Sequence, residues 1–237
     1  MTLCDDLCIL GHSAEHASMS NVRNMIRRKW RAAGLTVSTL TGAALSKALP
    51  ALAALRIEVF RDFPYLYDGD LDYERGYLET FSEAAGAIIV IARDGDQIVG
   101  ASTGLPMSEA EPEWRAPFEA AKRPIDALFY CGESVLLAPY RGLGIGHAFF
   151  DEREAHATAL GLSASCFCGV VRPQEHPAKP TDYRPLDGFW EKRGYAPLSG
   201  IEAEFAWRDI GETDETIKRL QFWAARWIEQ QSLNNRP

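Results

Sequence analysis

The feature that most constrains this fold is an apolar strand that runs through a glycine-rich turn into a helix. The strand spans residues 128–137, Pro139 follows it, and Gly142, Gly144 and Gly146 lead into a helical pattern. Such a turn gathers backbone N–H groups at the positive end of a helix dipole, and that geometry binds phosphate. Glycine is needed there because a side chain would keep a pyrophosphate away from the backbone. The segment therefore predicts a phosphate-binding turn.

Two common phosphate-binding turns do not fit this segment. A P-loop ends in Gly-Lys-Ser/Thr, so that lysine reaches the phosphates, but here Gly146 is followed by His147. A dinucleotide fingerprint needs Gly-x-Gly-x-x-Gly, and counting from Gly142 places the third glycine at His147. The pattern that fits is Arg-x-x-Gly-x-Gly, carried by Arg141, Gly144 and Gly146. An ordinary strand–helix turn without a ligand is the alternative.

The composition suits one domain with a sizeable core, or at most two small ones. The chain has 237 residues, of which 46% are hydrophobic, and it includes 11 Phe, 8 Tyr and 6 Trp. Its net charge of −8 disfavours nucleic acid as a partner and favours a cationic substrate such as an amine. No apolar run approaches the ~18 residues of a membrane span, so no membrane partner is expected.

Residues 1–34 differ in composition from the rest and are expected to form a poorly ordered extension, so that a chain starting at Gly34 stays folded and active. Within them, Cys4, Cys8, His12 and His16 lack the Cys-x-x-Cys pair of structural zinc sites, and no metal is expected. The remaining cysteines are Cys131, Cys166 and Cys168. An odd number of cysteines in mostly apolar surroundings indicates free buried thiols and a cytoplasmic protein.

From residue 35 onward the pattern alternates between strands and helices. Strands are expected at 35–40, 87–92, 97–103, 128–137, 163–171 and 202–207. Helices are expected at 45–59, 70–83, 146–160, 187–194 and 213–230, and the loop at 106–126 has room for a short one. Asp94-Gly95 predicts a hairpin between the second and third strands. This order predicts a single α/β domain over 35–237, with one mixed sheet flanked by helices and a C-terminal helix.

Over about residues 35–210 this order, together with the Arg141–Gly146 motif, resembles the GNAT superfamily of N-acetyltransferases. A second segment, Phe189–Tyr195 (FWEKRGY), resembles the family's aromatic-Tyr-Glu-Lys-x-Gly-Phe motif. The resemblance implies a mostly antiparallel central sheet. It also implies acetyl-CoA as co-substrate, with the acetyl group passing to an amine by direct attack in a ternary complex.

The resemblance further implies where acetyl-CoA binds. The strand at 133–137 splays away from its neighbour at 163–171, and the pantetheine arm enters the gap beside the backbone of Leu137. The backbone N–H groups that hold the pyrophosphate belong to Arg141, Gly142, Leu143, Gly144, Ile145 and Gly146.

An amine acceptor must lose a proton before it attacks, because its free pKa is near ~10.4 for a lysine-like group. Glu133 is the first candidate base, since it lies on the strand beside the expected thioester. Strand alternation places it on one face with Cys131, Val135 and Leu137. The alternative for Glu133 is an ion pair with an arginine. His176, in the proline-rich loop at 172–187, is the second candidate, and a solvent-exposed loop histidine is its alternative.

One position departs from the family pattern. The tyrosine that often protonates the departing thiolate is replaced by Trp190, so Tyr183, Tyr195 or solvent is expected to supply that proton. The expected function is N-acetyl transfer to the amine of a small molecule. A non-catalytic acyl-CoA-binding or sensor module and a protein N-acetyltransferase are the alternatives, and a homodimer is left open.

Overall fold

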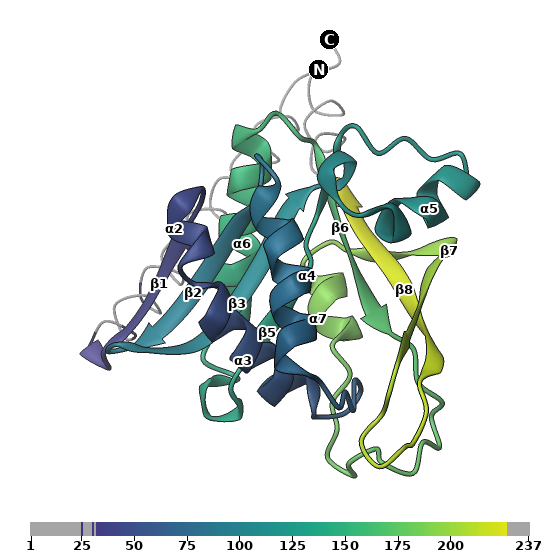
Figure 1. Cartoon of the computed structure of the whole chain (residues 1–237). Helices are drawn as coiled ribbons and strands as arrows, with labels where there is room; N and C mark the ends of the chain where they lie inside the picture. Colours follow the sequence, from purple (N-terminus) through teal and green to yellow (C-terminus); the bar gives the residue numbers. More distant parts are fainter. Residues whose placement is uncertain (1–24, 26–29, 31, 227–237) are drawn as a thin grey trace, which may run out of the picture.

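Eight strands pair into one sheet in the computed structural model, which describes residues 25, 30 and 32–226 (Figure 1). The strands are β1 (Leu35–Leu40), β2 (Ile88–Asp94), β3 (Gln97–Pro106), β4 (Leu128–Tyr130), β5 (Ser134–Leu136), β6 (Ala164–Val170), β7 (Ala196–Trp207) and β8 (Thr216–Arg226). Their order is β1-β2-β3-β4-β6-β8-β7, and β5 pairs with β3. Among these described pairings β4–β6 is parallel and the others are antiparallel, which confirms the mixed, mostly antiparallel sheet.

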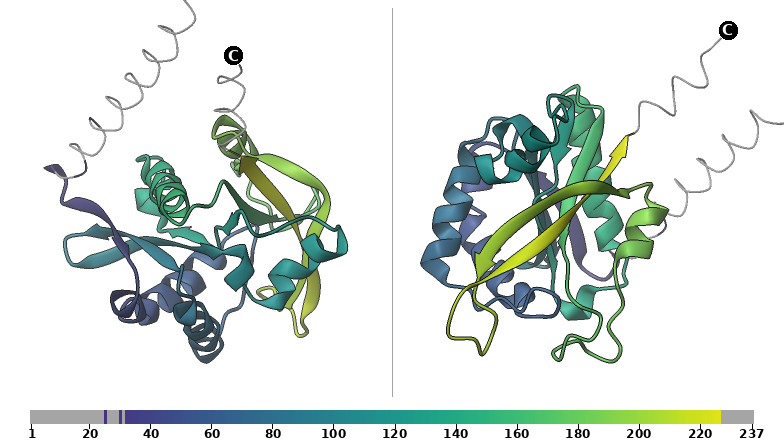
Figure 2. Two further views of the ribbon diagram at one scale, coloured as in Figure 1. Left: turned by 90° about the horizontal axis from the view of Figure 1, so that it is seen from above. Right: turned by 90° about the vertical axis from the view of Figure 1, so that its right-hand side faces the viewer.

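Helices cover both faces of the sheet (Figure 2). One face carries α3 (Leu49–Phe60), α4 (Leu71–Glu83) and α5 (Pro112–Ala120), and the other carries α6 (Ile145–Ala159) and α7 (Asp187–Lys192). The remaining elements are short: α2 (Ala43–Ser46), η1 (Met107–Glu109) and η2 (Ala138–Tyr140). We call the face with α3 the α3 side and the face with α6 the α6 side. Each face buries its own hydrophobic cluster, the α3-side cluster and the α6-side cluster. No helix among the described residues is long and apolar enough to cross a bilayer.

Local sequence signals account for most element boundaries. Asp70 caps α4, because its side chain accepts hydrogen bonds from the backbone N–H groups of Asp72 and Tyr73, both at 3.0 Å. Gly95, with φ of +54°, forms the turn of the predicted β2–β3 hairpin. Most predicted elements before β8 lie close to the expected residues, but the helix expected at 45–59 divides into α2 and α3, and the strand expected at 202–207 begins at Ala196.

A bulge divides the strand expected at 128–137 into β4 and β5. Gly132 N–H donates to the carbonyl of Thr103, and Thr103 N–H donates to the carbonyl of Glu133, so two residues oppose one on β3. A Cβ on Gly132 would lie 2.6 Å from Thr103 Oγ1, so only glycine permits this approach. The last bond towards β6 runs from Cys131 N–H to the carbonyl of Cys166, and β5 then pairs with β3 alone. The predicted splay is confirmed.

The bulge also overturns one prediction. Simple alternation places Cys131, Glu133 and Val135 on one face, but Cys131 packs in the α6-side cluster and Val135 in the α3-side cluster. The extra residue at the bulge shifts the alternation by one position. As a result, Glu133 faces α3 together with Tyr130.

The C-terminal helix expected at 213–230 is wrong, because Thr216–Arg226 forms β8. Lys218, Leu220 and Phe222 are buried at a spacing of two, whereas Ile217 is 68% exposed. β8 lies between β6 and β7, and the face that carries Ile217 is exposed there but buried at Trp223. Because the apolar Ile217 is exposed while the charged Lys218 is buried, the apolar residues do not alternate along this strand and instead fall at helix-like spacing. Residues 227–230 lie outside the described range.

Most of residues 1–34, including Cys4, Cys8, His12 and His16, lie outside the described range, so the extension expected there stays a prediction. Trp30, however, is 7% exposed and packs in the α6-side cluster. Its Nε1 donates a hydrogen bond to the carbonyl of Leu143 at 2.9 Å. A chain that starts at Gly34 lacks this buried ring and its hydrogen bond.

Replacing Trp30 by alanine is expected to destabilise the domain by about 3 kcal/mol, because a large buried ring and its hydrogen bond are lost. For a chain of this size the melting temperature should fall by roughly 6–10 °C. Thermal unfolding followed by circular dichroism measures the change. Met25→Ala is the control, since Met25 is 51% exposed. Equal melting temperatures for both variants and the wild type would contradict the packing role of Trp30.

Candidate active site

The predicted phosphate-binding turn lies between β5 and the N-terminus of the 15-residue helix α6. Gly142 and Gly144 have φ of +76° and +84°, in the left-handed region that strains other residues. Within the described part of the chain, the N–H groups of residues 142–146 donate to no protein acceptor. The N–H of Arg141 instead donates to the carbonyl of Ala138 at 3.1 Å, so Arg141 does not belong to the row of free N–H groups in which it was expected. A row of such N–H groups at a helix N-terminus stabilises an anion.

The side chains of the turn anchor it to its surroundings. Arg141 donates from Nε to the carbonyl of Leu136 at 3.1 Å and pairs with Asp62 at 3.0 Å. Ile145 is buried in the α6-side cluster, and the carbonyl of Leu143 receives the bond from Trp30. The Arg141 side chain thus fixes the turn to the end of β5, while the backbone of the turn faces solvent.

The gap between β5 and β6 starts at the bulge and ends near this turn. Leu137 N–H donates to the carbonyl of Val99, on the β3 side of the strand. The opposite edge of β5 pairs with no strand among the described residues. A free strand edge that leads to a row of free N–H groups fits the amides and the pyrophosphate of coenzyme A.

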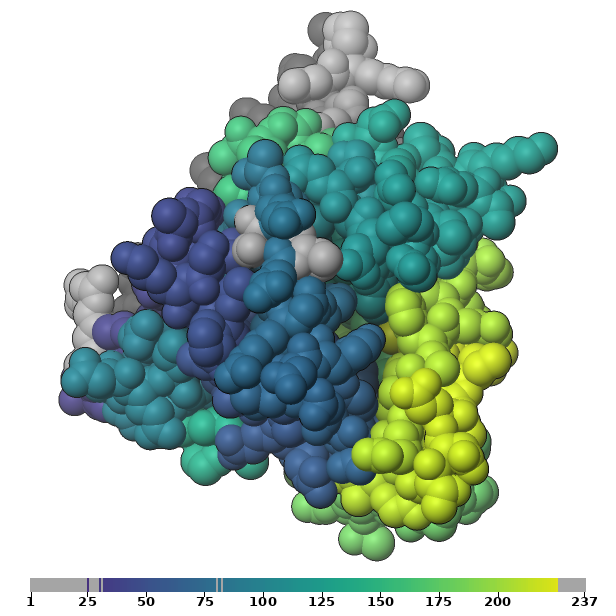
Figure 3. All heavy atoms as spheres, viewed as in Figure 1, coloured from purple at the N-terminus to yellow at the C-terminus, as the bar shows by residue number. Residues whose placement is uncertain are grey.

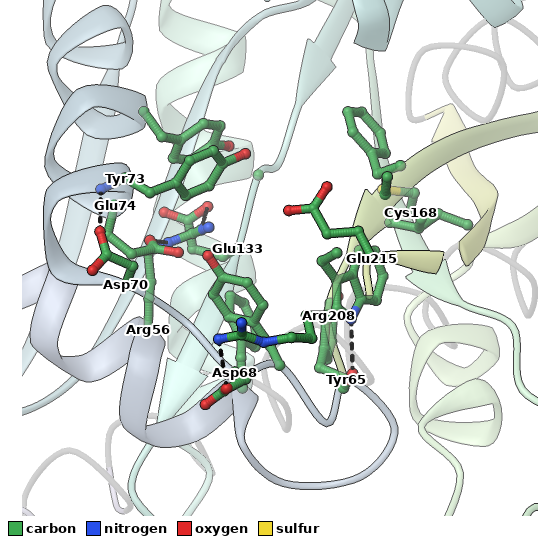
Figure 4. Close-up of a pocket in the computed structure, with 18 of the residues that line it drawn as sticks. Arg56, Tyr65, Asp68, Asp70, Tyr73, Glu74, Glu133, Cys168, Arg208 and Glu215 are labelled. Carbon is green, nitrogen blue, oxygen red and sulfur yellow. Dashed lines mark hydrogen bonds and ion pairs between the residues drawn. The ribbon is translucent and has the colours of Figure 1, made fainter. Parts of the chain in front are cut away.

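A cavity of about 580 Å³ opens on the α3 side of the same gap. Gly132 and Glu133 line it from one edge of the gap, and Cys168 of β6 lines it from the other. Side chains of α4 and of the β7–β8 hairpin lie on either side of it (Figure 3; Figure 4). Both sides of the strand gap therefore contribute to one cavity.

Glu133 belongs to a buried ionic cluster at the base of this cavity (Figure 4). Its Oε2 pairs with Arg56 Nη1 at 2.7 Å, and Arg56 Nε donates to Glu74 Oε2. Burial opposes the charge of Arg56, but Glu133, Tyr77 and Glu74 together raise its pKa above the ordinary value. Glu133 is only 7% exposed, and its Oε1 has no hydrogen-bond partner in the described part of the chain. One carboxylate oxygen is thus free to accept a proton or a hydrogen bond.

Aromatic side chains are the most numerous kind of residue in the cavity wall. Trp114 packs against Tyr130 and Phe205, with ring centroids 5.0 and 4.2 Å apart. Tyr65 lies at 6.1 Å from the ring of Trp207. Burial raises the pKa of Tyr65 and Tyr130, so both phenols keep their protons at neutral pH. The cavity therefore offers neutral hydroxyl donors beside a carboxylate.

His176 and Tyr183 lie together in the loop between β6 and α7, away from the cavity wall. Both rings pack against Phe63, with centroids 5.6 and 4.7 Å away. His176 Nδ1 accepts a hydrogen bond from the N–H of Ala178 at 3.2 Å. Neither residue lines the cavity that contains Glu133.

Trp190 and Tyr195 lie on the α6 side of the sheet. Trp190 packs against Phe167 and over Gly169, where a Cβ would lie 2.9 Å from its ring. Tyr195 is buried, and its hydroxyl bonds to Ser165 and Glu154. Trp190 therefore fills space beneath β6, and Tyr195 belongs to a polar network away from the cavity.

The three cysteines among the described residues are free, as expected. Burial raises the pKa of the Cys131 thiol to about 11 and that of the Cys168 thiol to about 12. Both stay protonated at neutral pH and are poor nucleophiles. In the part of the chain that the structure describes, no group of three or more His, Cys, Asp or Glu side chains is arranged to hold a metal ion.

Sequence reasoning missed Arg56, Glu74 and most of the aromatic wall. Glu74 carries a signal that could have revealed it, since it shares the buried face of α4 with Leu78 and Phe81 and is fully buried. A carboxylate in an apolar stripe needs a partner, because an unpaired buried charge is costly. The aromatic residues come from several distant elements, and no local spacing connects them.

Arg153 of α6 supports the bulge from the opposite face. It is 1% exposed and donates from Nη1 to the carbonyls of Thr103 and Glu133, at 3.1 and 3.2 Å. Its Nε donates to the carbonyl of Phe149. One guanidinium thus binds the backbone on both strands of the bulge and fixes the position of Glu133.

Solved structures share this fold, although no protein-family model and no curated protein sequence matches the chain. A ribosomal-protein-alanine N-acetyltransferase from Brucella melitensis superposes with a TM-score of 0.52 and 17% identity, over 81% of this chain and 99% of that one. An acetyltransferase of the GNAT family from Streptococcus pneumoniae gives 0.50 and 13%, over 81% and 99%. A putative acetyltransferase from Salmonella typhimurium, solved with its cofactor acetyl-CoA, gives 0.50 and 10%, over 81% and 94%.

These comparisons show the fold of the chain, an α/β domain like that of these acetyltransferases. The chain has the fold of the GNAT superfamily of N-acetyltransferases, as the two motifs predicted.

Arg153→Met is expected to destabilise the protein by about 2–4 kcal/mol, because two buried carbonyls lose a charged donor. The melting temperature in thermal unfolding measures this loss. Arg75→Met is the matched control, since the Arg75 side chain is exposed and pairs with the exposed Asp72 on its own helix. The control should change stability by less than about 0.5 kcal/mol. If Arg153→Met and Arg75→Met have the same melting temperature, the bulge does not depend on the guanidinium of Arg153.

Proposed function

We propose that the protein is an acetyl-CoA-dependent N-acetyltransferase that acetylates the amine of a small molecule by direct attack. The observation that carries this proposal is the strand gap, which runs from the cavity at Gly132 and Glu133 to the phosphate-binding turn at Gly142–Gly146. A coenzyme A arm along the free edge of β5 would bring its thioester to the bulge when its pyrophosphate is on the turn. The acceptor amine would then reach the thioester from the cavity.

In this proposal the chain's own residues supply positioning and proton transfer. The N–H groups of residues 142–146 bind the pyrophosphate, and a free N–H on the β5 edge polarises the thioester carbonyl. Oε1 of Glu133 takes a proton from the acceptor ammonium, directly or through a water. The amine nitrogen then bonds to the acetyl carbon and gives its second proton to solvent, and the carbon–sulfur bond breaks to release the coenzyme A thiolate and a neutral amide.

The thiolate must receive a proton, and Trp190 cannot supply it. Tyr130, the last residue of β4, keeps its proton and points its hydroxyl to within 3.8 Å of Cys168 Sγ across the gap. We assign the donor role to Tyr130 or solvent. Tyr183 is a secondary candidate for this donor role, and His176 stays the second candidate for the base, since their loop lies outside the cavity wall.

A non-catalytic acyl-CoA sensor is the second candidate, because a tryptophan stands where the family's tyrosine acid is expected. Trp190 packs against Phe167, and this structural role accounts for a tryptophan at the position in an enzyme as well as in a sensor. Thiol release measured with a panel of amines, and with peptides carrying lysine or a free N-terminus, separates an enzyme from a sensor and a small acceptor from a protein acceptor.

Gly144→Asp is expected to abolish binding of coenzyme A, because it places a negative charge where the pyrophosphate lies. Coenzyme A at 100 times its dissociation constant should stabilise the wild type by about 2.7 kcal/mol, seen as a rise in melting temperature. Gly161→Asp is the matched control, since Gly161 also has a left-handed φ of +79° but lies after the far end of α6. Equal coenzyme A affinity of both variants in calorimetry would show that the turn does not bind phosphate.

Glu133→Gln keeps the side-chain shape and removes the proton acceptor. We expect kcat to fall by about 10²–10⁴-fold with the KM for acetyl-CoA unchanged. The acidic limb of the pH–rate profile should disappear, because that limb reports a base that must lose its proton. Glu58→Gln, an exposed change on α3, is the control.

A loss of less than about fivefold with the acidic limb intact would make Glu133 a structural carboxylate, since general bases contribute far more. In that case His176→Ala is the next variant. If His176→Ala lowers kcat tenfold or more and removes the acidic limb of the pH–rate profile, His176 in the loop between β6 and α7 is the base.

A further inference from the structure

The cavity carries more negative charge than one amine can neutralise. Its wall contains six carboxylates and two guanidinium groups, a formal charge of −4. Both guanidinium groups are already paired, Arg56 with Glu74 and Glu133 and Arg208 with Asp68 at 2.8 Å. The cavity therefore favours a ligand with more than one positive charge and disfavours a carboxylate.

The negative groups lie at two separate places. Glu133 and Glu74 are buried at the base, and an oxygen of each has no hydrogen-bond partner among the described residues. Asp70 and Glu215 are exposed at the mouth, and Glu215 points into the cavity from the β7–β8 hairpin (Figure 4). Unsatisfied buried oxygens call for a donor from a ligand, because leaving them unbonded is costly. One ammonium at the base leaves the charge at the mouth unopposed.

The wall between these two places is aromatic. Tyr65, Tyr77, Trp114 and Trp207 present ring surface to the cavity. Aromatic faces attract cations and also pack against methylene groups. The ring of Tyr77 already lies 4.6 Å from the guanidinium carbon of Arg56, so a cation is accommodated at this wall. An alkyl chain with an ammonium at each end matches this order of carboxylates, rings and carboxylates.

We propose that the acceptor is an aliphatic di- or polyamine without a carboxylate. One ammonium lies at the base of the cavity, where Glu133 deprotonates it for acetylation. A second ammonium is held at the mouth by Glu215 and Asp70, and the chain between them packs on the aromatic wall. This assignment rests on the proposed acetyl transfer and names its substrate class.

Binding is tested separately from catalysis, by calorimetry on the full chain in the presence of coenzyme A. The probe is 1,4-diaminobutane. It is compared with n-butylamine, which lacks the second charge, and with ornithine, which adds a carboxylate to the same diamine. We expect the diamine to bind at least about tenfold more tightly than either. 2-Phenylethylamine, a monoamine with an aromatic ring, should also bind at least about tenfold less tightly than the diamine.

Glu215→Gln isolates the second charge. It should weaken binding of the diamine by about fivefold or more and leave n-butylamine unchanged, since only the diamine reaches the mouth. Glu204→Gln is the control, because Glu204 is exposed on the neighbouring strand β7 and does not line the cavity. It should leave both affinities at the wild-type values.

Equal binding of 1,4-diaminobutane and any of the comparison amines overturns the substrate class, even when acetyl transfer is observed. An unchanged diamine affinity in Glu215→Gln does the same. Selective diamine binding without release of coenzyme A thiol would support the ligand class and contradict the proposed acetyl transfer. Failure of the substrate class and failure of the proposed function are therefore distinguishable.

Discussion

The bulge at Gly132 and Glu133 is the constraint on which the rest of the site depends. Two residues of the strand oppose Thr103, so the pairing with β6 ends at Cys131 and β5 turns towards β3. The same extra residue points Glu133 to the α3 side. The bulge therefore creates both the gap for a cofactor arm and the orientation of the carboxylate beside it.

Two arginines hold this bulge in place, one from each layer of helices; Arg153 is buried and the side chain of Arg56 is 12% exposed. Arg153 of α6 binds the backbone carbonyls of Thr103 and Glu133, and Arg56 of α3 binds the side chain of Glu133. Buried charges of this kind contribute little net stability, but removing one partner is costly. Their effect here is to restrict the position of one carboxylate, leaving one of its oxygens free.

The two faces of the sheet contribute different parts of the proposed site. The α6 side is closely packed around Phe149, Phe150 and Trp223, and it positions the phosphate-binding turn. The α3 side contains the acidic, aromatic cavity for the acceptor. Because the strand gap connects them, the cofactor and the acceptor can approach the same bulge from different elements. Trp190 contributes to the packing of the α6 side, which accounts for a tryptophan at a position where the family often has a catalytic tyrosine.

The sequence by itself determined the parts of the protein that depend on local spacing. The turn at Gly142 and Gly144 was predicted because a side chain there would keep a pyrophosphate away from the backbone, and in the structure both glycines also have positive φ. The β2–β3 hairpin followed from its Asp-Gly turn, and the GNAT fold followed from the order of elements and two motifs. The period of apolar residues failed at Thr216–Arg226, because Ile217 is exposed and Lys218 is buried, which breaks the apolar alternation that marks a strand.

Only the tertiary structure decided which side chains meet. Arg56, Glu74 and Glu133 come from α3, α4 and the bulge, and no spacing in the sequence relates them. His176 was a reasonable candidate by residue type, but its loop packs on Phe63 outside the cavity. Trp30 precedes the first strand, yet it closes the core against Leu143. Local conformation depends on neighbouring residues and can be read from the chain, whereas a binding site depends on contacts between distant segments that exist only once the sheet has formed.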